Sequence, residues 1–267
     1  MSELELIRRM AESIQKRTAE YLSTHEDYDQ ILSRRPTDVT RRFDIVAEEA
    51  LNDMIVEEGI VARVISEELG ERVVPEGKEP GYTLVMDPID GSTNLSMGIP
   101  YYCTSLALSN KVSGATFADI TAGAVAAVWG KTFYASKNNG AFYDGERLAT
   151  KEHPEKPRYV LYSFGVGPVP DNIIPLVEER CLVRTMGSIA LDMCYVAKGS
   201  LDAIIDSRNR ISGYDIMAAA LILKEAGGIL TDYSGRDLSA LSVKASGISV
   251  VGAANSTLHS TILKRLH

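Results

Sequence analysis

Residues 82–94, YTLVMDPIDGSTN, constrain the fold of this 267-residue chain more than any other stretch. They begin as an apolar run that is typical of a buried strand, and the run breaks at its proline. Asp87 and Asp90 stand on the turn, and residues of helix-capping types follow Gly91. Carboxylates at the end of a strand suit a hard cation such as Mg²⁺, and free N–H groups at the start of a helix suit a phosphate. The stretch therefore predicts a metal and phosphate site, with an ordinary Asp-Pro turn and N-cap as the alternative.

Composition places the chain among soluble globular proteins, because 45% of its residues are apolar and 24% are charged. The net charge of −8 argues against nucleic acid or an acidic membrane surface as the main partner. No window of about 18 apolar residues predicts a membrane span, and the acidic start MSELE does not resemble a signal peptide, so we expect a cytoplasmic protein. The three cysteines show no C-x-x-C spacing and are expected to be small core residues: Cys103, Cys181 and Cys194.

Hydrophobic periodicity divides the chain into regions of different character. Residues 3–23 and 43–58 have helical spacing, whereas the polar, Gly- and Pro-bearing residues 69–81 predict a loop. From residue 101 to about 166, short strand-like runs separated by turn signals predict an antiparallel sheet, and after residue 181 strands and helices alternate. The expected strands are residues 60–65, 84–86, 102–108, 122–129, 132–135, 159–162, 181–186, 202–205, 229–233 and 248–251, and the expected later helices are residues 188–198, 214–226 and one from about 256.

This mixture predicts an α+β fold, a layered α/β/α/β/α sandwich. We expect a single unit over residues 1–267, with an N-terminal part to about residue 166 that carries the metal motif and a C-terminal α/β part from about residue 167. No long linker or internal repeat marks a sharp boundary.

Acidic residues stand at several places where the chain is expected to turn. Asp44 and Asp215 begin predicted helices, Glu67 follows a predicted strand, and Asp87 and Asp90 end the central strand. Each has a local alternative, either as a helix N-terminal acid or as a solvated loop acid. Together they supply the oxygen ligands that Mg²⁺ prefers. Two metal ions about 3.5–4 Å apart are a common device for hydrolysing phosphate esters.

The same residues carry a family resemblance. Glu67-Glu68, the segment Asp87-Pro-Ile-Asp-Gly-Ser-Thr-Asn94, and Gly213-Tyr-Asp215 with a following Glu-Ala-Gly-Gly segment resemble the inositol monophosphatase family. That family includes dual-function fructose-1,6-bisphosphatase/inositol monophosphatases. The order and spacing match from about residue 36 to residue 230. The resemblance implies the sugar phosphatase/inositol monophosphatase fold and a hydrolase that uses two or three Mg²⁺ ions to cleave fructose 1,6-bisphosphate or inositol 1-phosphate with an activated water.

The resemblance also implies roles for the acids. Glu67, Asp87 and the carbonyl of Ile89 would bind one Mg²⁺, and Asp87, Asp90 and Asp215 would bind the second. Ser92 would hold the attacking water, with Asp44 behind it as acceptor, and the amides of Gly91 and Ser92 would hold the phosphate being cleaved.

A second segment would contact the rest of the substrate. In relatives the residues matching Gly187, Ser188 and Ile189 touch the sugar or inositol ring, and an acid near Asp206 bonds its hydroxyls. Arg184 and Arg208 resemble arginines that face the substrate, and guanidinium groups suit a second phosphate. The alternative is that these arginines only balance the acidic surface. The segment from residue 202 to 215 is about two residues longer than the matching segment of simple inositol monophosphatases.

Other functions stay open from the sequence. A phosphatase of the same fold for 3′-phosphoadenosine-type nucleotides or NADP(H) is one alternative, and a non-catalytic metal- and inositol-binding regulator is another. The partner would be a small phosphorylated sugar or polyol, and the resemblance implies a homodimer. Residues 30–40, which include Asp38, are a candidate for closing over the metals. The histidines lie away from the acids in the sequence and are expected at the surface.

Overall fold

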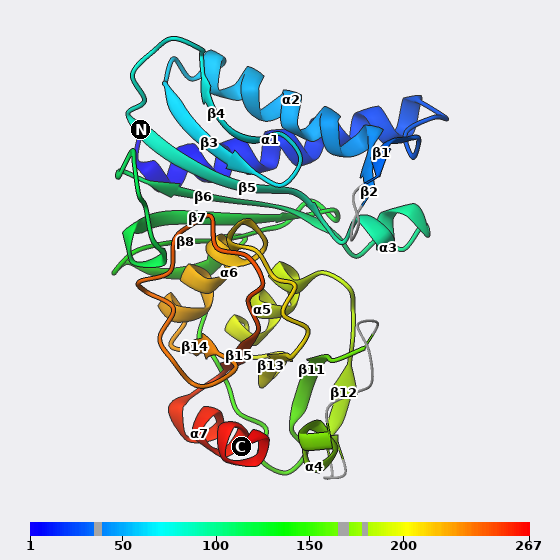
Figure 1. The fold of residues 1–267 in the computed structure, drawn as a ribbon, viewed down its shortest axis with the longest axis vertical. Coiled ribbons are helices and arrows are strands. Elements are labelled where there is room, and N and C mark those ends of the chain that lie inside the picture. The colour runs from blue at the N-terminus through cyan, green and yellow to red at the C-terminus, as the bar shows by residue number, and fades with distance from the viewer. Residues whose placement is uncertain (35–38, 165–170, 178–180) are drawn as a thin grey trace.

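The computed structural model describes residues 1–34, 39–164, 171–177 and 181–267 (Figure 1). The chain forms alternating layers of helices and sheets. Helices α1 (Glu3–Thr24) and α2 (Arg42–Glu57) cover one face of the larger sheet. Helices α5 (Ile189–Ala197) and α6 (Gly213–Glu225) fill the space between the two sheets, and α4 (Ile174–Val177) and α7 (Ser256–Leu266) lie on the outer face of the smaller sheet. This arrangement confirms the predicted α/β/α/β/α sandwich.

The larger sheet has the strand order β10-β9-β8-β7-β6-β5-β3-β4. Strands β3 and β5 run parallel, and the other neighbouring pairs are antiparallel. Strand β5 lies inside the sheet and is buried beyond its first residue, which explains its apolar run. The strands are β3 (Ala62–Ser66), β4 (Gly70–Val74), β5 (Tyr82–Asp90), β6 (Cys103–Ser109), β7 (Ile120–Ala127), β8 (Thr132–Ser136), β9 (Gly140–Tyr143) and β10 (Glu146–Arg147).

The smaller sheet has the order β12-β11-β13-β15-β14. Its members are β11 (Arg158–Tyr162), β12 (Leu182–Arg184), β13 (Ala203–Asp206), β14 (Ile229–Asp232) and β15 (Val250–Ala253). Strand β11 runs parallel to both of its neighbours. The expectation that β11 continues the antiparallel sheet of the middle section was therefore wrong. Its sequence pattern indicates a strand but not the sheet that the strand joins.

Helix α6 is apolar on several sides because it packs between the two sheets. Its buried residues include Met217, Ala218 and Leu223. A Cβ atom at Gly123 of β7 would lie 2.9 Å from the Cα atom of Ala218, so the glycine lets the helix approach the sheet closely. This contact limits the distance between the larger sheet and α6, the helix whose first turn carries Asp215.

Several local expectations need correction. Strand β4 forms where residues 69–81 were expected to be a loop, and the short hairpin of β1 (Ile31–Arg34) and β2 (Val39–Arg41) forms where no strand was expected. Apart from Thr40 of β2, the residues of these strands are exposed or half-buried, so an apolar pattern does not mark them. Asp38 lies outside the described residues. His259 is buried on α7 and bonds Thr231, contrary to the expected surface position.

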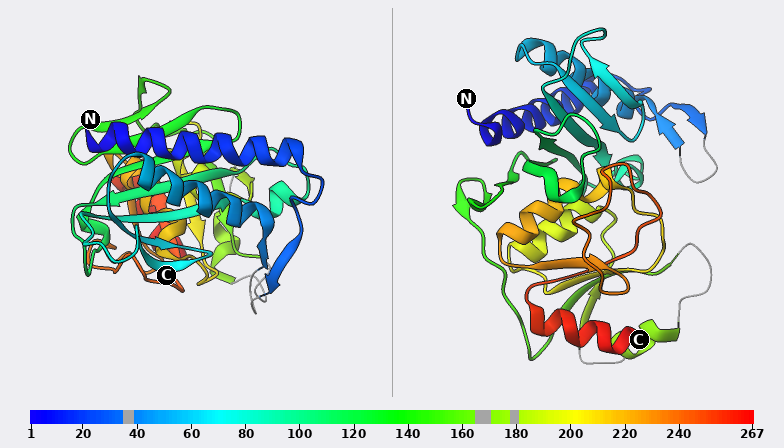
Figure 2. Two further views of the ribbon diagram at one scale, coloured as in Figure 1. Left: turned by 90° about the horizontal axis from the view of Figure 1, so that it is seen from above. Right: turned by 60° about the vertical axis from the view of Figure 1, so that its left-hand side comes forward.

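The remaining elements are short. They are α3 (Ser92–Ser96) and two 3₁₀ turns (Phe117–Asp119 and Asp171–Ile173). Figure 2 shows α1 crossing the molecule above the larger sheet, with α7 on the far side.

Cys103 and Cys194 are buried as expected, and Cys181 is half-buried. None of the helices in the described residues combines the length and apolar character that a bilayer crossing requires.

Candidate active site

A cavity of about 380 Å³ opens where the end of β5 faces the start of α5, the end of β11 and the start of α6. It gathers polar side chains from segments that are far apart in the sequence. Its lining comprises Glu67, Asp87, residues 89–94, Tyr162, Phe164, Thr185, Gly187, Ile189, Arg208, Arg210, Ile211 and Asp215. The stretch of residues that ends β5 is therefore one wall of the cavity.

Three carboxylates meet in this cavity. One oxygen from each of Glu67, Asp87 and Asp215 lies within 4.8 Å of the others. The parallel register of β3 and β5 pairs Ser66 with Met86, so the acids that follow these two residues emerge side by side at the same sheet edge. Asp215 arrives from the first turn of α6, where its carboxylate also accepts the Ser212 N–H at 2.7 Å.

The electrostatics of the cluster favour a cation. Burial, and then the neighbouring charges of Glu67, Asp90 and Asp215, raise the pKa of the Asp87 carboxyl well above its ordinary value. Carboxylate oxygens crowded at this distance repel one another, and a divalent ion relieves that repulsion. An all-oxygen donor set also matches the preference of Mg²⁺ and related hard cations. The residues present therefore fit a divalent metal.

Asp90 has a different environment from the other three acids. One of its oxygens accepts from the Ser188 hydroxyl at 2.5 Å and the Ala190 N–H at 2.7 Å, and the other accepts from the Ile189 N–H at 3.2 Å. Burial raises the pKa of Asp90 to about 6, although these hydrogen bonds act in the opposite direction. Asp90 thus caps the N-terminus of α5 while it lines the cavity, a role that the sequence did not reveal.

The turn after Asp90 requires its glycine. Gly91 has φ +100°, and a Cβ atom there would lie 2.9 Å from the Tyr101 carbonyl oxygen. Helix α3 begins at the next residue, Ser92, so the first amides of this turn have no acceptor within the helix. Nearby, the Ile89 N–H donates to the Asp87 carboxylate at 3.0 Å. The cavity wall therefore presents helix-start amides next to the carboxylates.

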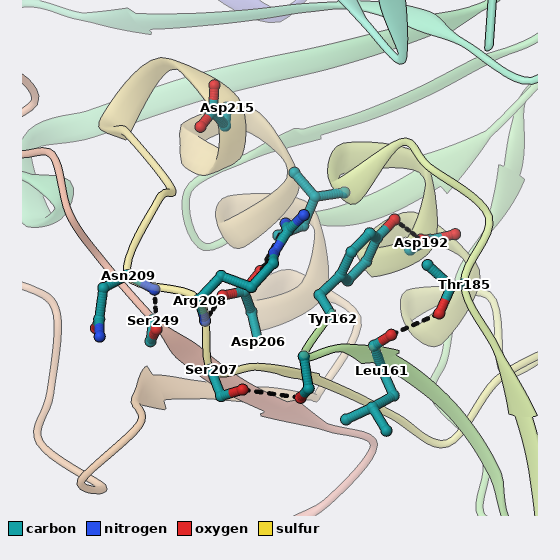
Figure 3. A network of polar contacts seen from close by, with 12 residues as sticks. Leu161, Tyr162, Thr185, Asp192, Asp206, Ser207, Arg208, Asn209, Asp215 and Ser249 are labelled. Carbon is teal, nitrogen blue, oxygen red and sulfur yellow. Dashed lines mark hydrogen bonds and ion pairs between the residues drawn. The ribbon is translucent and has the colours of Figure 1, made fainter. Parts of the chain in front are cut away.

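Two arginines, Arg208 and Arg210, also line the cavity. Arg208 is held by buried Asp206, whose carboxylate accepts from Nε at 2.8 Å and lies 2.7 Å from Nη2. The guanidinium also lies over the Tyr162 ring, 4.4 Å from its centroid (Figure 3). Arg210 reaches the cavity from the same loop. Two arginines therefore line the same cavity as the carboxylate cluster.

Four predicted site residues are absent from the cavity lining that the described residues form: Asp44, Arg184, Ser188 and Asp206. Asp44 is buried in the first turn of α2 and accepts the Arg41 N–H at 2.8 Å. Arg184 is exposed on β12 and donates to the neighbouring Val183 carbonyl. Ser188 and Asp206 lie one contact away, through Asp90 and Arg208.

The site residues predicted from the sequence do not include seven residues that line the cavity, namely Thr93, Asn94, Tyr162, Phe164, Thr185, Arg210 and Ile211. Arg210 stands two residues after Arg208 and could have been chosen on charge alone. Tyr162 could not, because it reaches the site through the parallel register that pairs it with Asp206. Sheet membership of β11 was the missing information.

A family model named the inositol monophosphatase family matches residues 2–267. The chain belongs to the inositol monophosphatase family. A Thermococcus kodakarensis protein named fructose-1,6-bisphosphatase/inositol-1-monophosphatase is 35% identical over 86% of this chain and 83% of its own length. A Methanococcus maripaludis protein named bifunctional NADP phosphatase/NAD kinase is 30% identical over 98% of this chain and 49% of its own.

A solved structure from Pyrococcus horikoshii, described as similar to inositol-1 monophosphatase, superposes with a TM-score of 0.77 at 29% identity. The match covers 96% of this chain and 94% of that one. These findings confirm the family and the fold that the motifs indicated.

Proposed function

We propose that this member of the family is an Mg²⁺-dependent phosphomonoester hydrolase that acts on fructose 1,6-bisphosphate, inositol 1-phosphate or both. The observation that carries the proposal is the meeting of Glu67, Asp87 and Asp215 within 4.8 Å, in the cavity that also presents the start of α3. Metal ligands and phosphate-binding amides on one wall are what metal-assisted phosphate hydrolysis needs.

Glu67, Asp87, the carbonyl of Ile89, Asp90 and Asp215 would hold two or three Mg²⁺ ions. Bound there, the ions would supply positive charge to the phosphate and lower the pKa of a bound water. The chain's own residues would do the rest. Ser92 would hold the attacking water through its hydroxyl, with Asp44 as acceptor behind it, and the amides of Gly91 and Ser92 would hold the phosphate oxygens.

The arginines support a substrate with a second phosphate. Arg208 and Arg210 line the cavity, and a guanidinium binds phosphate through paired N–H donors. Gly187 and Ile189 would contact the sugar or inositol ring from the wall. Ser188 and Asp206 would act through the residues they bind. A contact of Arg184 with substrate stays a prediction.

The test is phosphate release by the purified protein with Mg²⁺ and with EDTA, from fructose 1,6-bisphosphate, inositol 1-phosphate, NADP and a 3′-phosphoadenosine nucleotide. We expect Mg²⁺-dependent release and a fall in kcat/KM of about a hundredfold or more in Asp215→Asn, because the variant loses a ligand charge. Asp53→Asn, on the exposed surface of α2, is the matched control. Equal release in EDTA, or full activity in Asp215→Asn, would refute the proposal.

A nucleotide substrate is the second candidate. Phe164 is 56% exposed and lines the cavity, where an aromatic ring can stack on a base. The relative named NADP phosphatase/NAD kinase is consistent with this possibility for the fold. If NADP is the substrate, it gives the highest kcat/KM in the panel, and Phe164→Ala lowers that value selectively. A non-catalytic regulator would release no phosphate from any of the four compounds.

The assembly and surroundings are further proposals. We infer a homodimer in the cytoplasm, acting on small phosphorylated metabolites and not on nucleic acid or membranes. Sedimentation equilibrium tests the assembly, because a dimer has twice the chain mass of 29.1 kDa. A single species at the chain mass would show that the dimer is wrong.

A further inference from the structure

Tyr162 lines the cavity and contacts two other parts of its lining, Arg208 and Gly187. It is the last residue of β11, and the parallel register pairs it with Asp206, the last residue of β13. Arg208 lies two residues beyond that strand end. The ring of Tyr162 therefore meets Arg208 because two neighbouring parallel strands end at the same level.

The ring face of Tyr162 helps to fix the Arg208 guanidinium. Arg208 has Asp206 on its Nε and Nη2 side, and its guanidinium carbon lies 4.4 Å from the Tyr162 ring centroid. Figure 3 shows the guanidinium extended along the ring. A cation over an aromatic face is attracted by the ring's quadrupole, and the plane of the guanidinium is restrained. Arg208 also lines the cavity, so the donors that Asp206 does not take are left for a ligand there.

The hydroxyl of Tyr162 bonds residues on the other side of the ring from β13. It donates to the Asp192 carboxylate at 2.5 Å and accepts the Gly187 N–H at 3.0 Å. Asp192 is fully buried on α5 and also accepts from the Tyr101 hydroxyl at 2.7 Å. A rigid, buried partner thus sets the direction of the Tyr162 hydroxyl.

The Gly187 segment, which bonds that hydroxyl, is followed by the residues that bond Asp90. Gly187 has φ +91°, and a Cβ atom there would lie 2.8 Å from the Asn94 side chain, so the backbone passes close to the phosphate-binding turn. The next residues, Ser188 to Ala190, bond the Asp90 carboxylate. Loss of the Tyr162 hydroxyl would loosen this segment for any substrate.

We propose that Tyr162 determines substrate selectivity: its ring positions Arg208 for the second phosphate of a sugar bisphosphate, while its hydroxyl positions the Gly187 segment for every substrate. This inference rests on the proposed phosphatase function. The two parts of one side chain make separable contributions. Removal of the hydroxyl alone lowers activity without changing preference, and removal of the ring changes preference.

Two variants separate these contributions. In Tyr162→Phe, kcat/KM falls by a similar factor for fructose 1,6-bisphosphate and inositol 1-phosphate, and their ratio stays within about twofold of the wild type. In Tyr162→Leu, the ratio of kcat/KM for fructose 1,6-bisphosphate to that for inositol 1-phosphate falls by about three- to thirtyfold more. The fall comes from a higher KM for the bisphosphate. Tyr233→Phe, which also loses a hydroxyl bond but lies outside the cavity lining, is the matched control.

A double-mutant cycle tests the route through Arg208. In an Arg208→Met background, Tyr162→Leu should cause no further change in the substrate ratio. A shift of the ratio that persists in this background would overturn the proposal, as would a shift in Tyr162→Phe as large as in Tyr162→Leu. If Tyr162→Leu does not fold, as judged by near-UV circular dichroism, Tyr162→Met carries the same expectation. A wild-type protein that hydrolyses neither fructose 1,6-bisphosphate nor inositol 1-phosphate refutes the proposed activity on these two substrates, and this result is distinct from a failure of the Tyr162 proposal.

Discussion

Asp87 illustrates how a residue can lower stability to serve a site. Its carboxyl is buried beside Glu67 and Asp215, and this setting raises its pKa well above the ordinary value because of burial and neighbouring charge. Without a cation, the folded protein bears the cost of these crowded acids. With a divalent ion bound, the same cluster becomes a source of stability.

We therefore predict opposite effects of Asp87→Asn with and without metal. In EDTA the variant should be more stable than the wild type by about 1–2 kcal/mol, or several degrees in Tm, because one crowded carboxylate is gone. With Mg²⁺ in excess, the wild type should gain more Tm than the variant. Thermal denaturation followed by circular dichroism measures both, with Asp53→Asn as control. A variant that is less stable than the wild type in EDTA would contradict this account.

For single residues, the sequence predicted the acids of the site better than it predicted their hydrogen-bond partners. Glu67, Asp87 and Asp215 were placed by their positions at strand and helix ends, and the structure brings them together. The bond of Ser188 to Asp90 was not predicted, because no local pattern in either segment indicates that the two side chains meet. Such a contact depends on how the layers stack.

Helix α6 is the element on which the site most depends. It carries Asp215 in its first turn and packs against β7 at Gly123, where a Cβ atom would lie 2.9 Å from the Ala218 backbone. A methyl group at this point has no space unless helix and sheet move apart. The distance from the Asp215 carboxylate to those of Glu67 and Asp87 would then increase.

Gly123→Ala should thus lower both stability and activity. We expect a loss of about 1–3 kcal/mol from overpacking, measured by urea denaturation, and a raised Mg²⁺ requirement for phosphate release. Gly81→Ala is the matched control, since the nearest atom to a Cβ atom there is 3.9 Å away, and it should change stability by less than about 0.5 kcal/mol. Equal stability of Gly123→Ala and the wild type would show that the contact is not tight.

Periodicity identified the buried elements and missed the edge strands β4 and β10 of the larger sheet. The runs of β5, β6 and α6 are apolar because they are covered on both faces, and they were found. Strand β4 is half-buried at the edge of its sheet and reads as a polar loop. Strand β11 was found as a strand and assigned to the wrong sheet, because local pattern carries no information on strand pairing.

In the molecule as a whole, the stacking of the layers brings Asp87 at the end of β5 close to Asp215 in the first turn of α6. The core between the sheets contains residues of both, including Val85 of β5 and Ile204 of β13. The alternation of elements was enough to predict the layers, and the family match confirms the fold. The cavity lies at one edge of this sandwich, where β5, β11 and α6 meet.

We expect this edge of the sandwich to bind divalent metal ions through the carboxylates. Crystals grown with Mn²⁺ in place of Mg²⁺ and measured at the manganese absorption edge test it most directly. We predict anomalous difference peaks within coordination distance, about 2–2.5 Å, of Glu67, Asp87 and Asp215, and their loss in Asp87→Asn. A wild-type map with no peak among these three carboxylates would contradict the account.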